Sequence, residues 1–359
     1  MFEQSEKPPR LVVRGVNWLG DAVMSMPALM RLREALPEAH IALLTEEKLA
    51  DLWTNHPAIN EVIRFTKLEG VGQVSRKLRA GKFDAALILP NSFRSAFESW
   101  MAGIPIRVGY GRPLLLTHKI PPRAEHIEMH KRSAAEVKRL VSSFPNKHRD
   151  SYPLSGHHLH QYLRLVSFFG ASETPQAPAI KIAPEEVSAF LEKFGVDRSS
   201  KLVGLNPGAE YGPAKRWPVD RFIEVGQTID RRCLIFGGPG DVPTATQIAA
   251  AIPSSVNLAG RTSLRELAVA LSICDALLTN DTGPMHLASA VGTRLVVPFG
   301  STSPELTGPG LPGDSRHRLI LGEAPCAPCF LRECPIDFRC VRSIEVERVI
   351  RSIEEILSA

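Results

Sequence analysis

Two series of short apolar segments, each alternating with helical patterns, constrain the fold of this 359-residue chain more than any other feature. The first series predicts strands at 10–16, 41–45, 61–65, 83–89 and 106–110. The second series predicts strands at 201–206, 233–238, 256–260, 275–280, 294–300 and 318–322. Strands that alternate with helices form βαβ units and parallel sheets. We therefore predict an α/β protein with two doubly wound, Rossmann-like halves.

The region between the two series indicates where the chain divides. Two long helical patterns, at about 127–143 and 157–169, precede the proline-rich segment ASETPQAPAIKIAP. Proline-rich segments between periodic elements are typical of loops and linkers. Apolar residues recur at helical spacing in the final segment, which predicts an amphipathic helix. The predicted parts are an N-terminal domain over 1–170, a linker over 171–184, a C-terminal domain over 185–342, and a helix over 343–359 that docks near the domain boundary.

Composition predicts a soluble protein. Hydrophobic residues make up 44% of the chain and charged residues 23%, which is ordinary for a globular protein. No window reaches the roughly 18 consecutive apolar residues that a membrane-spanning helix needs. The first segment, MFEQSEKPPR, has no apolar stretch of the kind found in signal peptides. We expect a cytoplasmic location.

Much of the net charge of +5 lies between residues 112 and 149, which we call the basic region. Its cations are Arg112, Lys119, Arg123, Lys131, Arg132, Lys138, Arg139, Lys147 and Arg149. Such a region suits an anionic partner, which could be nucleic acid, an anionic membrane surface or a phosphorylated substrate. A solvated helix face is the alternative interpretation.

The segment GVNWLGDAV, at 15–23, lies where the first predicted strand gives way to a helix. Gly15, Asn17 and Gly20 form G-x-N-x-x-G, and Asn17 puts a side chain where a dinucleotide fingerprint needs glycine. We therefore expect no nicotinamide cofactor in this half. Asp21 follows at the helix start, where an aspartate commonly caps the helix. A carboxylate at this edge of a parallel sheet also faces the crevice where ligands bind, so both roles are open.

The loop LNPGAEYGPAKRWP, at 205–218, follows the first strand of the second half. Its prolines and glycines make it rigid, and Lys215 and Arg216 suit a phosphate group. A surface turn with solvated cations is the alternative. Trp217 is expected to anchor the loop in the core. Beyond the next strand, Asp241 lies where such folds place a carboxylate on ribose hydroxyls.

In DALLTNDTGPMHLASAVG, at 275–292, a helix is predicted to begin near Gly283. The first-turn amides, reached past Thr282 and Gly283, form a site of the kind that binds diphosphates. Asp281 would repel phosphate, but it can accept a sugar hydroxyl or the Lys215 ammonium. His286 can hydrogen-bond a phosphate oxygen, or it can be a satisfied interior histidine.

Four cysteines within CAPCFLRECPIDFRC give C-x2-C-x4-C-x5-C. They could hold a structural zinc ion or remain reduced thiols in a compact loop. A catalytic metal is not expected. The histidines of His126-x3-His130 and of the segment 156–160 lack an accompanying carboxylate pattern, and we interpret them as solvated or acceptor-side residues.

Three of these segments, NWLGDAVMSMPAL, PGAEYGPAKRWP and NDTGPMHLASAVG, together resemble the ADP-heptose:lipopolysaccharide heptosyltransferases, in that family's order. LPNSFRSAFESWMAGIPIRVGY and CAPCFLRECPIDFRC are similar to the same family. The GPAKRWP version of the central motif is most like the heptosyltransferase II branch. The resemblance extends from about residue 10 to 357.

The resemblance implies a GT-B architecture, with the acceptor mostly on the first Rossmann-like domain and ADP-heptose mostly on the second, facing each other across a cleft. It implies inverting transfer of L-glycero-D-manno-heptose to the first heptose of the lipopolysaccharide inner core, without a cofactor or catalytic metal. By match to the family motifs, Asp21 is the base and Lys215 neutralises the diphosphate. Thr282, Gly283 and Asp281 are the other donor-side residues that match. We add His286 for a phosphate oxygen and Asp241 for ribose on the donor side. Further acceptor-side candidates, just past the end of a predicted strand, are Asn91, Ser92 and Arg94.

The implied partners are ADP-heptose, a heptosyl-Kdo2-lipid A acceptor and the inner face of the cytoplasmic membrane through peripheral contact, with no nucleic acid. The alternatives are heptosyltransferase I or III acting on a different core acceptor, and a non-catalytic nucleotide-sugar-binding protein. An epimerase would need bound nicotinamide, which the missing fingerprint glycine disfavours.

Overall fold

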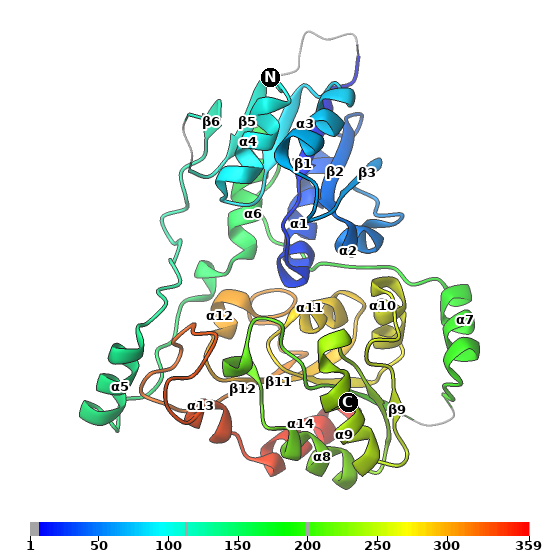
Figure 1. Cartoon of the computed structure of the whole chain (residues 1–359), viewed down its shortest axis with the longest axis vertical. Helices are drawn as coiled ribbons and strands as arrows, with labels where there is room; N and C mark the ends of the chain where they lie inside the picture. The colour runs from blue at the N-terminus through cyan, green and yellow to red at the C-terminus, as the bar shows by residue number, and fades with distance from the viewer. Residues whose placement is uncertain (1–6, 112–113, 199–200, 359) are drawn as a thin grey trace. The chain divides into compact units, whose positions relative to one another are not determined.

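Each half of the chain folds around its own six-stranded parallel sheet (Figure 1). The computed structural model describes residues 7–111, 114–198 and 201–358. These residues divide into two compact units. The first unit contains the chain up to 126 together with 157–178, and the second contains 127–156 and the chain from 179 onward. The predicted pair of doubly wound, Rossmann-like parallel sheets is confirmed.

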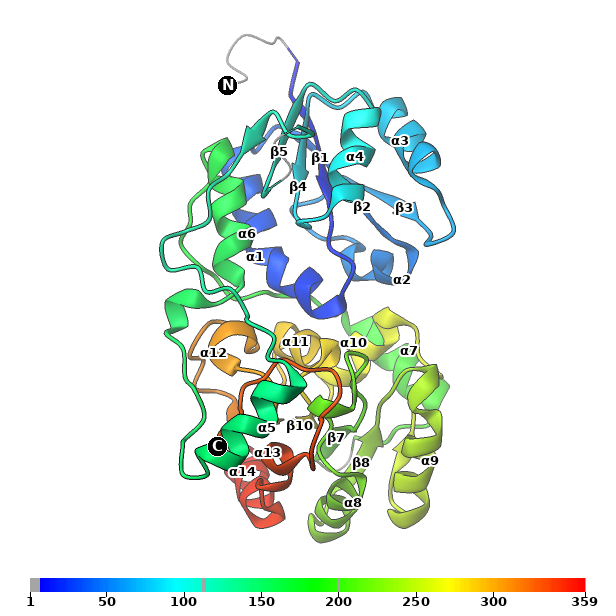
Figure 2. The ribbon, with the colours of Figure 1, turned by 60° about the vertical axis from the view of Figure 1, so that its left-hand side comes forward.

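The first sheet has the strand order β3-β2-β1-β4-β5-β6. Its strands are β1 (Arg10–Arg14), β2 (His40–Glu46), β3 (Glu61–Phe65), β4 (Ala85–Ile88), β5 (Ile106–Gly109) and β6 (His118–Lys119). The helices of this unit are α1 (Leu19–Ala35), α2 (Glu47–Ala50), α3 (Val71–Ala80), α4 (Phe93–Met101) and α6 (Leu159–Val166). Helices α1 and α6 pack together on one face of the sheet, and α3 and α4 pack together on the other (Figure 2).

The second sheet has the strand order β12-β11-β10-β7-β8-β9. Its strands are β7 (Leu202–Asn206), β8 (Arg232–Ile235), β9 (Val256–Asn257), β10 (Ala276–Thr279), β11 (Arg294–Phe299) and β12 (Arg318–Leu321). The helices of this unit are α5 (Ala134–Ser143), α7 (Pro184–Phe194), α8 (Val219–Thr228), α9 (Val242–Ala251), α10 (Leu264–Ser272), α11 (Gly283–Ala290), α12 (Pro304–Thr307), α13 (Arg339–Arg342) and α14 (Val346–Ser358).

The central strands are buried on both faces, which is why they appear in the sequence as nearly continuous apolar runs. All residues of β4, β7 and β10 are buried. The predicted strands all appear, most of them shortened by one or two residues at an end. The short strand β6 was not predicted, because its two residues are both exposed and carry no apolar signal.

The segment 127–156 packs with the second unit, although we predicted it as part of a domain over 1–170. Val137 of α5 belongs to the hydrophobic core of the second unit, where Leu140 and Val141 pack against it. The predicted helix over 127–143 begins only at Ala134, because Ser133 accepts a hydrogen bond from the Glu136 amide and caps it. Helix α6 likewise covers less than the predicted 157–169.

The terminal helix α14 packs against α8, β10 and β11 of the second unit. Val346, Val349, Ile353 and Ile356 are buried in that unit's core, so the amphipathic pattern of the sequence has its expected partner. Its predicted docking near a domain boundary stays a prediction. Across residues 7–111, 114–198 and 201–358, we find no helix with the length and apolar character needed to cross a bilayer.

Both sheets reverse their strand order at one point, which is β1 beside β4 in the first and β7 beside β10 in the second. In doubly wound sheets, ligands bind in the crevice beyond the carboxyl ends of the strands at such a point. The loop after β1 leads into helix α1, whose first turn contains Asp21. The loops after β4, β7 and β10 contain Asn91, Lys215 and Asp281, respectively. The fold therefore places most of the predicted site residues where binding sites form.

Candidate functional site

A cavity of about 290 Å³ opens at the strand-order reversal of the first sheet. The loop after β1 contributes Asn17 and Trp18, and the loop after β4 contributes Asn91 and Ser92. The remaining polar lining residues are Asp21, Tyr110, His158, Gln161 and Tyr162. Three of the predicted residues, Asp21, Asn91 and Ser92, are thus brought together.

Asp21 lies in the first turn of α1, where the helix dipole favours a carboxylate. The N-cap residue is Trp18, so Asp21 does not occupy the cap position itself. The Tyr162 hydroxyl donates a hydrogen bond of 3.0 Å to Asp21 Oδ1. The carboxylate is therefore oriented from a second helix, α6, while it lines the cavity.

Two neighbours of Asp21 stay neutral near pH 7. Burial raises the pKa of Tyr162 well above its ordinary value, and the adjacent Asp21 charge raises it further, so the phenol remains a proton donor. Burial lowers the pKa of His158, although the Asp21 charge opposes that shift. Asp21 therefore supplies the carboxylate of this cavity. The other titratable groups that line it, the phenols of Tyr110 and Tyr162 and the imidazole of His158, are uncharged.

A buried arginine holds the loop that carries Asn17. Arg14, the last residue of β1, donates to the Gly15 carbonyl at 2.5 Å and to Asn17 Oδ1 at 3.2 Å. Its guanidinium also pairs with the fully buried Glu98 at 3.0 Å. Asn17 thus occupies the position where a dinucleotide fingerprint has glycine, and its side chain is held by the hydrogen bond from Arg14.

Arg94, which we predicted on the acceptor side, is engaged elsewhere. Its guanidinium donates to Glu98 at 2.8 Å and to the Glu69 carbonyl at 2.7 Å, and it does not line the cavity. Ser92 lines the cavity and also caps α4, because its Oγ accepts a bond from the Ser95 amide. Asn91 lies so close to Gly111 that a Cβ there would approach Asn91 Oδ1 to 2.8 Å.

In the second unit, Lys215 and Asp281 form a short ion pair at the strand-order reversal. Lys215 Nζ lies 2.6 Å from Asp281 Oδ2, and the Thr302 hydroxyl donates to the same oxygen at 2.6 Å. Asp281 is only 3% exposed. The predicted contact between Lys215 and Asp281 is present, and it concentrates both charges at one end of the sheet.

Trp217 and Asn280 fix the loop that carries Lys215. Asn280, at the end of β10, accepts from the Trp217 amide at 3.0 Å and donates to the Pro207 carbonyl at 2.7 Å. The fully buried Trp217 indole donates to the Ile344 carbonyl at 3.2 Å. The predicted role of Trp217 as an anchor is confirmed, and Asn280 is a structural residue that sequence reasoning missed.

The cysteine-containing segment braces the same loop. Lys215 Nζ and the Arg332 guanidinium each lie 5.0 Å from the centre of the Tyr211 ring, and the Tyr211 hydroxyl donates to the Phe330 carbonyl at 2.9 Å. Gly212 has a φ of +153°, and a Cβ there would meet the Arg332 carbonyl at 2.5 Å. The close approach of the two segments thus requires glycine at this position.

Helix α11 begins at Gly283 with Thr282 as its N-cap, as predicted. The Thr282 side chain makes no capping hydrogen bond, so it does not occupy the first-turn amides. His286, one turn further on, is buried, and burial lowers its pKa to about 4. Its imidazole is therefore neutral at pH 7 and can donate one hydrogen bond.

Asp241 lies beyond β8, next to the loop of Lys215. Its Oδ2 accepts from the Gly238 amide at 3.1 Å, and Arg216 lies 3.8 Å from Oδ1. A Cβ on Gly208 would come within 2.4 Å of the carboxylate. The second unit therefore brings Asp241, Lys215, Asp281 and the start of α11 to the same end of its sheet.

The basic region is partly structural. Buried Arg132 pairs with Asp150 and donates its amide to the Cys329 carbonyl. The Arg149 guanidinium donates to the carbonyls of Phe299, Gly322 and Thr302. Lys138 and Arg139 of α5 are exposed, and Arg112 lies outside the described residues. Two of the cations that we counted toward an anionic partner instead stabilise the second unit.

The four clustered cysteines, Cys326, Cys329, Cys334 and Cys340, are free thiols. Burial and the neighbouring thiols raise the pKa of Cys340 to about 12, so it stays protonated at pH 7. Within the part of the chain that the structure describes, no three His, Cys, Asp or Glu side chains are grouped to hold a metal ion.

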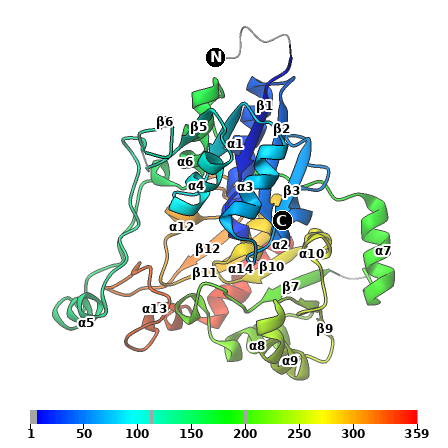
Figure 3. The ribbon, with the colours of Figure 1, turned by 45° about the horizontal axis from the view of Figure 1, so that its top comes forward.

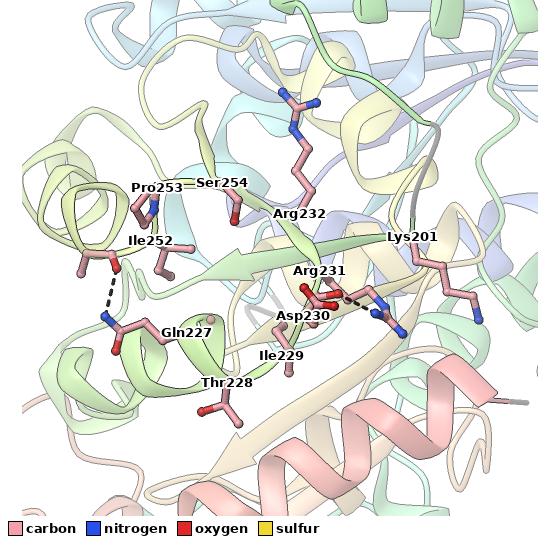
Figure 4. Close-up of a pocket in the computed structure, with 12 residues that line it drawn as sticks. Lys201, Gln227, Thr228, Ile229, Asp230, Arg231, Arg232, Ile252, Pro253 and Ser254 are labelled. Atoms are coloured by element: carbon pink, nitrogen blue, oxygen red, sulfur yellow. Dashed lines mark hydrogen bonds between the residues drawn. The ribbon is translucent and has the colours of Figure 1, made fainter.

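A larger cavity of about 970 Å³ lies at the other end of the strands of the second sheet, away from Lys215 and Asp281 (Figure 4). It is lined by Lys201, Arg231 and Arg232, which precede or begin β7 and β8, and by Pro253 and Ser254 after α9. This is the amino end of the strands, whereas ligands of doubly wound sheets bind beyond the carboxyl ends. We therefore do not assign the predicted chemistry to it.

Comparison with known proteins gives matches over most of the chain. The model of glycosyltransferase family 9 (heptosyltransferase) matches residues 71–338. Lipopolysaccharide heptosyltransferase 2 of Escherichia coli K12 is 30% identical, over 87% of this chain and 89% of that protein. Lipooligosaccharide heptosyltransferase 2 of Haemophilus influenzae is 27% identical over the same shares. The structure of E. coli ADP-heptose lps heptosyltransferase II matches with a TM-score of 0.78 and 26% identity, covering 97% of this chain and 98% of that one.

Proposed function

Because this chain belongs to glycosyltransferase family 9, the heptosyltransferases, we propose that it acts as heptosyltransferase II. In this reaction L-glycero-D-manno-heptose moves from ADP-heptose to the first heptose of the lipopolysaccharide inner core, with inversion at the anomeric carbon. The observation that carries the proposal is the pair of sites at the two strand-order reversals. A carboxylate lines the first site, and a lysine stands beside a helix start at the second.

Asp21 is the proposed base. As the acceptor hydroxyl attacks the anomeric carbon, its proton passes to the Asp21 carboxylate, and the carbon–oxygen bond to ADP breaks. Tyr162 donates to one carboxylate oxygen, Oδ1, and so orients the other toward the substrate. Neutral His158 adds no cation that would compete for this carboxylate. Asn91 and Ser92, which line the same cavity, are proposed to bind acceptor hydroxyls.

The second unit is proposed to hold ADP-heptose and to stabilise the departing ADP. The electron pair of the broken bond becomes negative charge on the diphosphate, which Lys215 and the amides of Thr282 and Gly283 can neutralise. His286 donates one hydrogen bond to a phosphate oxygen. Asp281 keeps Lys215 in place and accepts a hydroxyl of the heptose, while Asp241 accepts ribose hydroxyls. Since these groups supply the needed charge, we expect no cofactor or metal.

The proposed acceptor, heptosyl-Kdo2-lipid A, is anionic and anchored in lipid. We therefore propose a cytoplasmic enzyme that contacts the inner face of the cytoplasmic membrane peripherally. The exposed cations Lys138 and Arg139 suit the acceptor's carboxylates and phosphates. No nucleic acid is expected as a partner, because this chemistry accounts for the exposed part of the basic region.

Incubation of the purified protein with ADP-heptose and Kdo2-lipid A cores carrying no, one or two heptoses tests the proposal. We expect the mass of the core to increase by one heptose only when one heptose is already present. A product from the heptose-free core would assign heptosyltransferase I, and one from the two-heptose core would assign heptosyltransferase III. Binding of ADP-heptose without any product would assign a non-catalytic nucleotide-sugar-binding protein.

A further inference from the structure

Helix α4 presents three aromatic rings on the surface of the first unit. Phe93, Phe97 and Trp100 follow one another at the spacing that places them on one face of the helix. The ring centres of Phe93 and Phe97 lie 5.4 Å apart with planes 22° from parallel, and those of Phe97 and Trp100 lie 5.4 Å apart with planes 14° from parallel. We call these three residues the aromatic ladder.

The ladder is turned away from the core. Phe93 is 57% exposed and Trp100 is 47% exposed. The residues of α4 that face inward are small or polar, and they include Ser95, Ala96 and the ion-paired Glu98. Phe97, between them in the sequence, is half-buried. Burial of the exposed ring surface would stabilise the protein through the hydrophobic effect, yet much of it remains in water. Contiguous exposed apolar side chains of this kind mark interaction surfaces.

The segment that contains the ladder is rich in cations. The segment 66–107, which contains α3 and α4, has seven Lys or Arg residues and three acidic residues. Of the acids, Glu98 is fully buried between two arginines, Glu69 pairs with Lys77, and Asp84 accepts from the Arg10 amide. The exposed charges of this segment are therefore mostly positive. They are the cations Lys67, Arg76, Lys77, Arg79, Lys82 and Arg94, of which Lys77 and Arg94 are ion-paired, and the acid Asp84.

The two helices that carry most of these cations and the rings, α3 and α4, lie side by side (Figure 3). Arg79 of α3 donates to the carbonyl of Met101, the last residue of α4, at 2.6 Å. Arg94, next to Phe93, donates to the Glu69 carbonyl before α3 at 2.7 Å. Arg76 and Lys82 are exposed nearby in sequence. Aromatic rings flanked by exposed cations match the chemistry of an anionic bilayer surface.

We propose that the aromatic ladder docks the first unit onto an anionic phospholipid bilayer, with the rings at the headgroup level and the α3 and α4 cations on the lipid phosphates. This inference rests on the proposed function, whose acceptor is anchored in lipid. Charge favours this occupant over a second copy of the chain, because two such faces would repel each other.

The position of the ladder supports the same partner. Phe93 directly follows Asn91 and Ser92, which line the cavity of Asp21, and Ser92 caps the helix that carries the rings. A docked α4 therefore brings the edge of this cavity to the lipid surface. A sugar attached to a lipid anchor needs that proximity, whereas a freely diffusing acceptor does not.

Flotation of the full-length protein with vesicles tests the proposal. We expect the protein to float with phosphatidylcholine vesicles that contain phosphatidylglycerol, and the floated fraction to fall about tenfold in the double variant Phe93→Ser, Trp100→Ser. The matched control is Phe144→Ser, since Phe144 is 52% exposed at the end of α5 and lies outside the ladder. Flotation of this control should equal that of the wild type. Phe93→Trp should retain it.

Two further measurements separate docking from transfer and from other partners. With a deacylated, water-soluble acceptor, the double variant should turn over at the wild-type rate, and with acceptor in vesicles it should turn over about tenfold more slowly. Flotation without turnover on either acceptor would refute the proposed function and leave docking in place. Equal flotation of wild type and double variant would overturn docking. So would a wild-type dimer in sedimentation that the double variant loses, because the ladder would then be an interface between copies.

Discussion

The hydroxyl of Tyr162 donates to Asp21 Oδ1 at 3.0 Å, although 141 positions separate the two residues in the chain. Helix α6 thus returns to the first unit and orients a carboxylate that lies at the start of α1. Because the phenol is buried and remains protonated, the contact is a permanent donor to one carboxylate oxygen. Replacing Asp21 and replacing Tyr162 should therefore have different effects on turnover.

Replacing Asp21 with Asn removes the proposed base and keeps the shape of the side chain. We expect turnover to fall by about 10²–10⁴-fold, while affinity for ADP-heptose stays close to the wild-type value. Initial rates and calorimetric binding measure these two effects. The matched control is Asp220→Asn, since Asp220 is also an acid in a helix first turn and is exposed. A similar stability change in both variants, with wild-type turnover in Asp21→Asn, would leave Asp21 with a structural role alone.

Replacing Tyr162 with Phe removes the donor and keeps the ring in the core. We expect kcat to fall about tenfold, with the acid limb of the pH–rate profile displaced to higher pH, because the charged carboxylate loses a hydrogen bond. KM for ADP-heptose should not change. Tyr110→Phe is the comparison, since Tyr110 lines the same cavity but donates to the Gln161 carbonyl. Its acid limb should stay in place, and an equal displacement in both variants would refute orientation of Asp21 by Tyr162.

Replacing Lys215 with Ala should raise the dissociation constant of ADP-heptose by more than tenfold. The same change leaves Asp281 as a buried carboxylate without its cation, so the free energy of unfolding should fall by about 3 kcal/mol. Titration calorimetry and chemical denaturation measure the two quantities. Lys193→Ala removes a lysine from an exposed pair with Glu266 and should cost less than about 1 kcal/mol. Unchanged donor affinity in Lys215→Ala would exclude this lysine from the donor site.

His286 predicts an acid sensitivity of the second unit. Its pKa is about 4 in the folded protein, against an ordinary value of 6.5, because burial disfavours the charged imidazole. Between these values the unfolded chain binds the proton and the folded chain does not, so stability is full above pH 6.5 and falls as the pH decreases toward 4. The loss approaches about 3 kcal/mol.

Urea denaturation at pH 7.5 and pH 5 measures this sensitivity in wild type and in His286→Gln. The difference in unfolding free energy between the two pH values should be smaller in the variant. His130→Gln, at an exposed histidine, should match the wild type. Equal pH dependence in all three proteins would show that His286 is not the group responsible.

Local patterns in the sequence predicted the two sheets because the central strands are buried on both sides. They also predicted Lys215, Asp281, Thr282 and Gly283 at one end of the second sheet, since the carboxyl ends of β7 and β10 adjoin. Tyr162 was missed because its contact with Asp21 depends on how α6 packs, which periodicity does not encode. Arg94 was predicted on the acceptor side from its position after a strand, but the buried Glu98 on the same helix binds it.

The basic region was the least predictable part. A count of charges could not distinguish Arg132 and Arg149, which are held by buried partners of the second unit, from the exposed Lys138 and Arg139. We predicted 127–156 as part of the first domain, whereas these residues pack with the second unit. These residues are fixed by contacts with segments near 299 and 329, which lie far along the chain.

The excursion of 127–156 into the second unit means that the backbone passes between the units three times, near 126, 156 and 178. The protein therefore cannot be dissected by one cut. Cleavage between 171 and 184 would release an N-terminal fragment that still carries α5. The C-terminal fragment would lose Val137 from its core, and it would lose the hydrogen bonds that Arg149 donates to the carbonyls of Gly322 and Thr302. Expressing either half alone would require circular permutation or a graft of this segment, because the two cores are interleaved along the backbone.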